Sequence, residues 1–141
     1  MKKLFKIDVI NRQYLFLVRP VRIRKLIMQV FKQEAKYTPR GQVNICFVDD
    51  RCIKNLNSRF LGKSCATDVL AFENSGFKEN IQADIVVSTQ SAFRNSRVFK
   101  TTPEYEIQLY VVHGILHILG FNDNNKRARA LMRKIESKYV Y

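Results

Sequence analysis

Acidic residues are scarce in this chain: 12 Asp and Glu stand against 25 Lys and Arg in 141 residues, for a formal net charge of +13. Such a surplus produces a positive potential that attracts polyanions, of which nucleic acid is the commonest. The alternative is that the extra Lys and Arg only keep a small protein in solution. We favour the first interpretation and expect a nucleic-acid partner.

Paired cysteines and long apolar stretches are also lacking. Cys46, Cys52 and Cys65 are odd in number and form no C-x-x-C pair, which argues against a disulfide framework and against a cysteine zinc site. No apolar stretch reaches the length of a transmembrane helix. Charged residues interrupt the N-terminal segment too early for a signal peptide. We therefore expect a cytoplasmic protein that does not contact membranes.

No repeat, low-complexity tract or Gly/Ser linker divides the sequence, so a single domain over residues 1–141 is expected. Strand candidates lie at 4–10, 43–48 and 83–88, with a further apolar run at 14–18. Helices are expected from Pro20, after Asp49–Asp50, at 89–98, from Pro103 to Gly120 and at 125–139. This pattern predicts an α+β fold, an α/β sandwich with one small mixed sheet of about four strands and about five helices.

Two histidines, the only ones in the chain, carry the clearest chemistry. His113 and His117 stand four residues apart on the helix predicted to end at Gly120, so both imidazoles share one face. Gly120 lets the chain turn, and Asp123 can then return as a third ligand. This is the H-x-x-x-H-x-x-G-x-x-[H/D] spacing of a class of zinc enzymes. Two histidines packed by chance on an apolar face would not explain the glycine and the carboxylate. We expect one divalent metal ion, zinc first, at the end of a central helix.

A glutamate is missing where zinc peptidases need one. In those enzymes the residue after the first histidine is the glutamate that serves as general base, whereas here it is Gly114. Proteolysis of the usual kind is therefore disfavoured. A bound metal ion still lowers the pKa of its water toward about 7 without a dedicated base.

Three motifs together resemble the YbeY family of bacterial metal-dependent endoribonucleases of ribosomal RNA maturation. The segment 113–123 is similar to H-G-x-L-H-L-x-G-[YF]-D-H. Leu56-Asn57 followed by 67–72 is similar to L-N…T-[DN]-V-L-S-F, and 83–88 is similar to G-D-I-[VI]-[IV]-S. The resemblance implies that His113, His117 and Asp123 are the metal ligands of a single-strand-specific endoribonuclease. It further implies 16S rRNA 3′ end processing and ribosome quality control, with a metal-bound water as the attacking group.

The chain departs from the family pattern at informative positions. Asp123 stands where the family usually has histidine, with Asn122 before it, and this makes a two-His, one-carboxylate set that iron or manganese could also occupy. Leu61 stands where the family has arginine after an aromatic residue. Arg59 and Lys63 are near enough to supply the missing cation and are our candidate catalytic residues. Ala71 for serine is a minor change.

Several other polar residues could have either a structural or a functional role. The RNA contacts are assigned to Arg94, Arg97, Lys100 and Arg127, each of which could equally be a solvated helix residue. Asp68 is either a cap or a partner of a metal ligand. Asp84 interrupts an apolar strand, and we expect it to be a buried, hydrogen-bonded carboxylate with a structural role.

Ribosomal RNA and ribosomal subunits are the expected partners, and a ribosomal protein or a GTPase is a further candidate. Three alternatives stay open. A hydrolase of another substrate, such as a peptide, would need a base from elsewhere in the chain. A non-catalytic ribosome assembly factor would use the metal structurally, an option supported by Leu61. A nucleic-acid-binding domain without metal would leave Asp123 unexplained.

Overall fold

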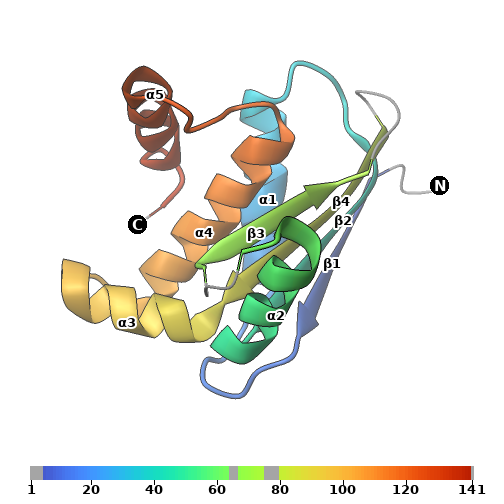
Figure 1. Cartoon of the computed structure of the whole chain (residues 1–141). Helices are drawn as coiled ribbons and strands as arrows, with labels where there is room; N and C mark the ends of the chain where they lie inside the picture. The colour runs from blue at the N-terminus through green and yellow to red at the C-terminus, as the bar shows by residue number, and fades with distance from the viewer. Residues whose placement is uncertain (1–4, 64–66, 75–79, 141) are drawn as a thin grey trace.

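Four strands and five helices follow one another in the computed structural model, which describes residues 5–63, 67–74 and 80–140 (Figure 1). In chain order they are β1 (Phe5–Asn11), α1 (Pro20–Glu34), β2 (Arg40–Val48), α2 (Asp50–Leu61), β3 (Val69–Glu73), β4 (Asn80–Ser88), α3 (Thr89–Phe99), α4 (Pro103–Ile118) and α5 (Lys126–Glu136). The α+β fold agrees with the prediction. The apolar run 14–18 is a loop, and β3 is the fourth strand. Cys65 lies outside the described residues.

The strands form one mixed sheet in the order β1-β2-β4-β3. β1, β2 and β4 are parallel, whereas β3 runs antiparallel to β4. Parallel neighbours need a crossover connection, and α1 provides it between β1 and β2. Continuous apolar runs in β2 and β4 suit this interior position, because both faces of those strands are covered over part of their length.

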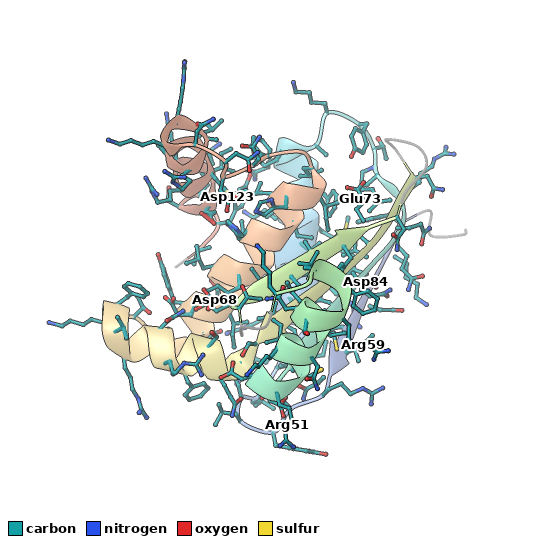
Figure 2. All side chains as sticks on the ribbon, viewed as in Figure 1. Arg51, Arg59, Asp68, Glu73, Asp84 and Asp123 are labelled. Carbon is teal, nitrogen blue, oxygen red and sulfur yellow. The ribbon has the colours of Figure 1, made fainter. Side chains whose placement is uncertain are left out.

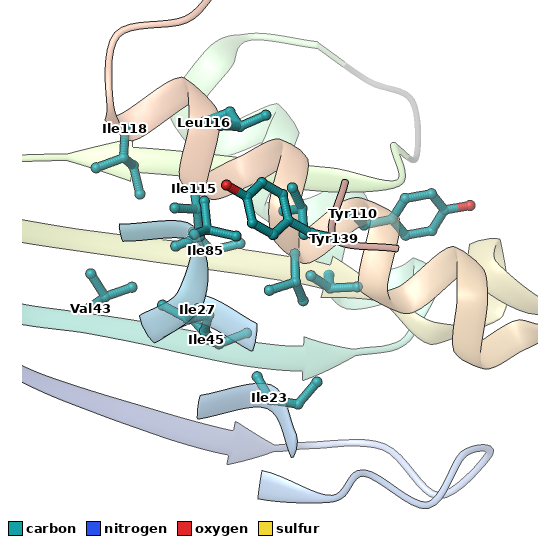
Figure 3. Close-up of a cluster of buried hydrophobic side chains, with 14 of the residues drawn as sticks. Ile23, Ile27, Val43, Ile45, Ile85, Tyr110, Ile115, Leu116, Ile118 and Tyr139 are labelled. Atoms are coloured by element: carbon teal, nitrogen blue, oxygen red, sulfur yellow. The ribbon is translucent and has the colours of Figure 1, made fainter. Parts of the chain in front are cut away.

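The main core lies between the sheet and the helices α1 and α4, which cover the same face (Figures 1 and 3). Ile27 of α1, Ile45 of β2, Ile85 of β4 and Ile115 of α4 are completely buried there. Burying one such side chain stabilises the fold by about 2 kcal/mol. α4 is apolar on most of its circumference and therefore forms the centre of the layer. Among the described helices, none is both long and apolar enough to cross a membrane.

The opposite face of the sheet is only partly covered. α2 packs on one end of it through Ile53, which contacts Val48, Leu70 and Val86 in a small second core. Beyond α2 the face is polar, and Asp84 lies exposed on it (Figure 2). The side-chain amide of Asn44 donates a hydrogen bond of 2.9 Å to the Asp84 carboxylate. The prediction that Asp84 is buried was wrong, because α2 is too short to reach it.

Candidate metal centre

Helix α4 presents both histidines on one face. Thr102 caps its N-terminus by accepting the backbone N–H of Tyr105 at 3.1 Å, and Pro103 occupies the first helical position, as predicted. His113 and His117 follow one turn apart near the C-terminal end, with ring centroids 4.6 Å apart and interplanar angle 74°. Both rings are partly buried, with 27% and 33% of their side chains exposed. One rigid helix therefore fixes two nitrogen ligands.

The turn after α4 returns the chain to these rings. Gly120 adopts a left-handed φ of 99°, and its N–H donates to the His117 carbonyl at 3.0 Å. The next N–H, of Phe121, donates to the Leu116 carbonyl at 3.0 Å, which completes a Schellman cap. Such a cap reverses the chain within two residues, and Asp123 follows at once. The glycine cap predicted from the sequence is confirmed.

Three ligand atoms converge at this turn. The Nε2 atoms of His113 and His117 are 3.1 Å apart, and Asp123 Oδ2 lies 3.7 Å from the first and 3.8 Å from the second. A point equidistant from all three atoms lies about 2.1 Å from each, which is the usual length of zinc–nitrogen and zinc–oxygen bonds. Neutral imidazoles and a carboxylate are ligands of a divalent cation. The residues present therefore fit the metal ion that the spacing predicts.

Burial favours the neutral, metal-binding form of His117. Its surroundings lower its pKa, chiefly because burial disfavours the charged ring and secondly because His113 lies beside it. A cation bound at this position would act in the same direction. The site is therefore suited to a metal ion rather than to a pair of protonated histidines.

Glu136, which sequence reasoning missed, completes the surroundings of His113. Its carboxylate oxygen Oε2 lies 3.1 Å from His113 Nδ1, and only 8% of its side chain is exposed. The one sequence signal is its place four residues after Met132, on the face that α5 buries. A glutamate at such a position needs a polar partner, but the sequence does not say which one.

The three ligands lie in a cleft of about 680 Å³. Besides the ligands and Glu136, α2 and the segment after it contribute Asn57, Leu61 and Lys63. The remaining walls come from Thr67 and Asp68, from β3 and from α4. Arg59 is exposed and is not among the described residues that line the cleft; in Figure 2 it lies on the far side of α2 from Asp68. Of the two candidate cations, Lys63 is the one that faces the metal ligands' cleft.

Asp68 lines the same cleft but is held by α3. Its Oδ1 accepts hydrogen bonds from the Ser91 hydroxyl at 2.6 Å and from the Asn95 amide at 3.3 Å. Asn95 also donates to the Tyr110 hydroxyl at 2.6 Å. Burial raises the pKa of Tyr110, so this phenol stays protonated and cannot act as a base near neutrality. The network ties α3 to Asp68, directly before β3, and to Tyr110 of α4.

The predicted RNA contacts lie on α3 and α5. Arg94 forms an ion pair with Asp50 at the start of α2. Arg97 and Lys100 are exposed at the C-terminal end of α3, and Arg127 is exposed in the first turn of α5. α3 contacts α4 at Tyr110 and α5 contacts it at His113, so the two helices flank the cleft.

A second hollow, of about 730 Å³, lies between α1 and α4. Among the described residues that line it, Glu104 is the one acidic residue and is paired with Arg22 at 2.8 Å, and there is no histidine or cysteine. Although this hollow is slightly larger, its described lining does not combine histidines with a carboxylate as the other cleft does. We therefore place the functional site in the cleft of the histidines.

Comparison with known proteins points the same way. Residues 8–141 match the family model described as endoribonuclease YbeY. Endoribonuclease YbeY of Petrotoga mobilis is 32% identical over 137 residues, which cover 96% of this chain and 94% of the relative. That of Christiangramia forsetii is 32% identical over 117 residues, covering 83% and 80%. The solution structure of TM1509 from Thermotoga maritima superposes with a TM-score of 0.66 at 27% identity, covering 95% of this chain and 86% of that one.

Proposed function

Because the chain belongs to the YbeY endoribonuclease family, we propose that it is a zinc-dependent enzyme that cleaves single-stranded regions of ribosomal RNA. The observation that carries the metal part of the proposal is the triangle of ligand atoms from His113, His117 and Asp123. The substrate we assign is the 3′ end of 16S rRNA, in the bacterial cytoplasm, during ribosome maturation and quality control. The net charge of +13 supports a polyanionic substrate.

The chain's own residues divide the work of phosphodiester cleavage. When bound, a divalent ion supplies Lewis-acid stabilisation of phosphate charge and a means of deprotonating water near neutral pH. Lys63, which lines the same cleft, neutralises the charge that develops on the phosphate. Gly114 stands where zinc peptidases have a glutamate after the first histidine, so the helix does not supply that general base.

Lys63 takes the cationic role in this proposal because it lines the cleft. The family's arginine position is occupied by Leu61, which also lines the cleft and brings no charge. Arg59 is a weaker candidate, since it lies on the other side of α2. A lysine is a point charge without the two-pronged geometry of arginine, so we expect slower cleavage than an arginine would support.

The RNA strand is proposed to cross the cleft between α3 and α5. Arg97 and Lys100 on one side and Arg127 on the other would contact phosphates, which are recognised by charge rather than by sequence. Arg94 contributes less, because Asp50 already neutralises it. Ribosomal subunits are the natural carriers of this RNA. A ribosomal protein or a GTPase is the proposed guide.

One observation favours a second function. The neutral Leu61 in the cleft is what a non-catalytic assembly factor would tolerate, with the metal ion holding α4, the Asp123 turn and α5 together. Such a protein would bind ribosomal subunits and cleave nothing. The two functions share the metal site and differ only in RNA cleavage.

Metal content and RNA cleavage, measured on the same preparations, test the proposal. Elemental analysis of the native chain should give about one zinc per molecule, and His117→Ala and Asp123→Ala should bind none while circular dichroism shows them folded. The zinc-loaded native chain should cut single-stranded RNA with the 16S 3′ end sequence and spare a duplex, and Arg59→Ala is the matched control that should still cut. Zinc without cleavage would establish the assembly factor instead. No zinc in the native chain, even when supplied, would overturn both functions.

A further inference from the structure

The two ring nitrogens of His113 face different partners. Nε2 points to the site of the proposed metal ion, 3.1 Å from His117 Nε2 and 3.7 Å from Asp123 Oδ2. Nδ1 points the other way, 3.1 Å from the Glu136 carboxylate. A neutral imidazole carries its proton on one nitrogen only, and the partner of one nitrogen decides the state of the other. The group at Nδ1 therefore controls whether Nε2 has a lone pair to offer.

The packing of α5 fixes the position of the Glu136 carboxylate. It lies near the end of α5, on the face that packs through Met132 and Ile135, and all three residues are buried. Tyr139, at 1% exposure, continues this packing after the helix. The packing holds the carboxylate against His113, where an unpartnered acid would be costly. The contact is thus built into the docking of α5 on α4.

We propose that Glu136 is the positioning residue of the metal centre: it accepts the Nδ1–H of His113 and so directs the Nε2 lone pair of that ring toward the metal position. This inference rests on the proposed metal site and extends it to α5. A ligand histidine whose far nitrogen donates to a carboxylate is fixed in both tautomer and ring orientation. Glu136 itself is not one of the three residues whose ligand atoms converge at the metal position.

The same geometry sets the state of His117 before metal binding. If His113 Nε2 carries the lone pair, the 3.1 Å contact between the two Nε2 atoms requires His117 to donate its Nε2–H. The metal-free pair is then asymmetric: His113 carries its proton on Nδ1, and His117 carries its proton on Nε2. His113 already has a lone pair on Nε2 for the ion. His117 must first lose the proton from its Nε2.

Nitrogen-15 spectra of the metal-free protein test this directly, because the chain contains only two histidines. At about pH 8, above the ordinary imidazole pKa of about 6.5, the native protein should show one ring of each tautomer. His117→Ala identifies the His113 signals. In Glu136→Leu, His113 should lose its preference for the Nδ1–H form, and in Glu136→Gln, whose amide oxygen still accepts, it should keep it. Lys134→Ala, on the exposed side of α5, is the control. A proton on His113 Nε2 in the native protein would overturn the inference.

Metal affinity is the second readout, measured with Co²⁺ through its visible absorption bands. Loss of such a partner typically weakens metal binding on the order of 10- to 100-fold. Glu136→Leu should show that loss, and Glu136→Gln a smaller one. Native-like affinity and native-like bands in a folded Glu136→Leu variant would reduce Glu136 to a packing residue. Neither readout involves RNA, so the inference stands or falls separately from the cleavage assay.

Discussion

Gly114 lies against Ile85 so closely that a Cβ added to the glycine would be 3.0 Å from Ile85 Cγ2 and 3.2 Å from its Cδ1. Helix α4 therefore packs closely on strand β4 at Gly114, the residue that directly follows His113. The same contact bears on the absence of the peptidase glutamate. A glutamate at position 114 would bring its side chain against Ile85 of the sheet, so this close packing disfavours it.

Gly114→Ala should therefore destabilise the protein, by about 1–3 kcal/mol through overpacking. Helix propensity alone predicts the opposite sign, because alanine favours a helix over glycine by about 1 kcal/mol. Urea unfolding of Gly114→Ala, of Ile85→Ala and of the double variant measures the free energy of unfolding of each. The double variant should be more stable than the sum of the single effects predicts. A more stable Gly114→Ala variant would show that α4 can move away from the sheet.

Asp123→His should narrow the choice of metal. Sites made of two histidines and one carboxylate are of a type that binds iron or manganese as well as zinc, whereas a third imidazole is a poorer ligand for manganese. We expect Asp123→His to bind zinc as the native protein does and to bind manganese more weakly, so that the ratio of bound zinc to bound manganese rises. Competition between the two ions, followed by elemental analysis after dialysis, measures the ratio. An unchanged ratio would mean that residue 123 does not bind the metal.

Lys63→Ala should lower the rate of RNA cleavage on the order of 100-fold, as loss of a group that stabilises transition-state charge does elsewhere. Arg59→Ala should change it by less than about twofold, because Arg59 lies outside the cleft. Leu61→Arg, which restores the family's residue, should raise the rate and partly rescue Lys63→Ala. Single-turnover kinetics on a single-stranded RNA compare the native protein with the three single variants and with the double variant Leu61→Arg/Lys63→Ala. Equal losses from Arg59→Ala and Lys63→Ala would refute the assignment.

Asp50 should make stability depend on pH. Burial alone would raise its pKa, but hydrogen bonds from Arg94 and Ser88 outweigh burial and lower the pKa in the folded state. The contribution of this carboxylate is therefore present above about pH 4 and is lost as the pH falls through the folded value. Asp50→Asn should cost about 1–2 kcal/mol at neutral pH and progressively less in acid. Urea unfolding between about pH 7 and pH 3 measures this, and a constant difference would contradict it.

RNA affinity should fall steeply with salt, because phosphate contacts release counterions. Arg127→Ala should reduce the slope of log affinity against log salt by about 1, if Arg127 contacts one phosphate. The same change at Arg51, on α2, should leave the slope unchanged. Fluorescence anisotropy at several salt concentrations gives the slopes. Equal effects from both variants would mean that RNA does not follow the path between α3 and α5.

The sequence predicted those parts of the site that one segment determines. His113 and His117 share a helix face, and Gly120 and Asp123 follow in the cap, so their convergence needs only local geometry. The α+β class was likewise predictable from the apolar runs of three strands and the helical spacing of apolar residues, but the fourth strand, β3, was not identified as a strand.

Tertiary packing determined the rest. Glu136 reaches His113 only because α5 docks on α4. Arg59 lies outside the cleft because of how α2 is rotated on the sheet, and Lys63 lines the cleft from the segment that follows α2. The exposure of Asp84 depends on the length of α2 relative to the strands beneath it. Neither rotation nor length relative to a distant strand can be read from spacing along the chain.

The cleft draws its walls from residues as far apart as Asn57 and Glu136. Both histidines lie on α4, whereas Glu136 comes from the end of α5, eighteen residues beyond the last residue of α4. Local unfolding or removal of α5 would therefore take away the buried carboxylate beside His113 while leaving His113, His117 and Asp123 in the chain. The integrity of the C-terminal helix is thus coupled to a centre whose three candidate ligands all precede it.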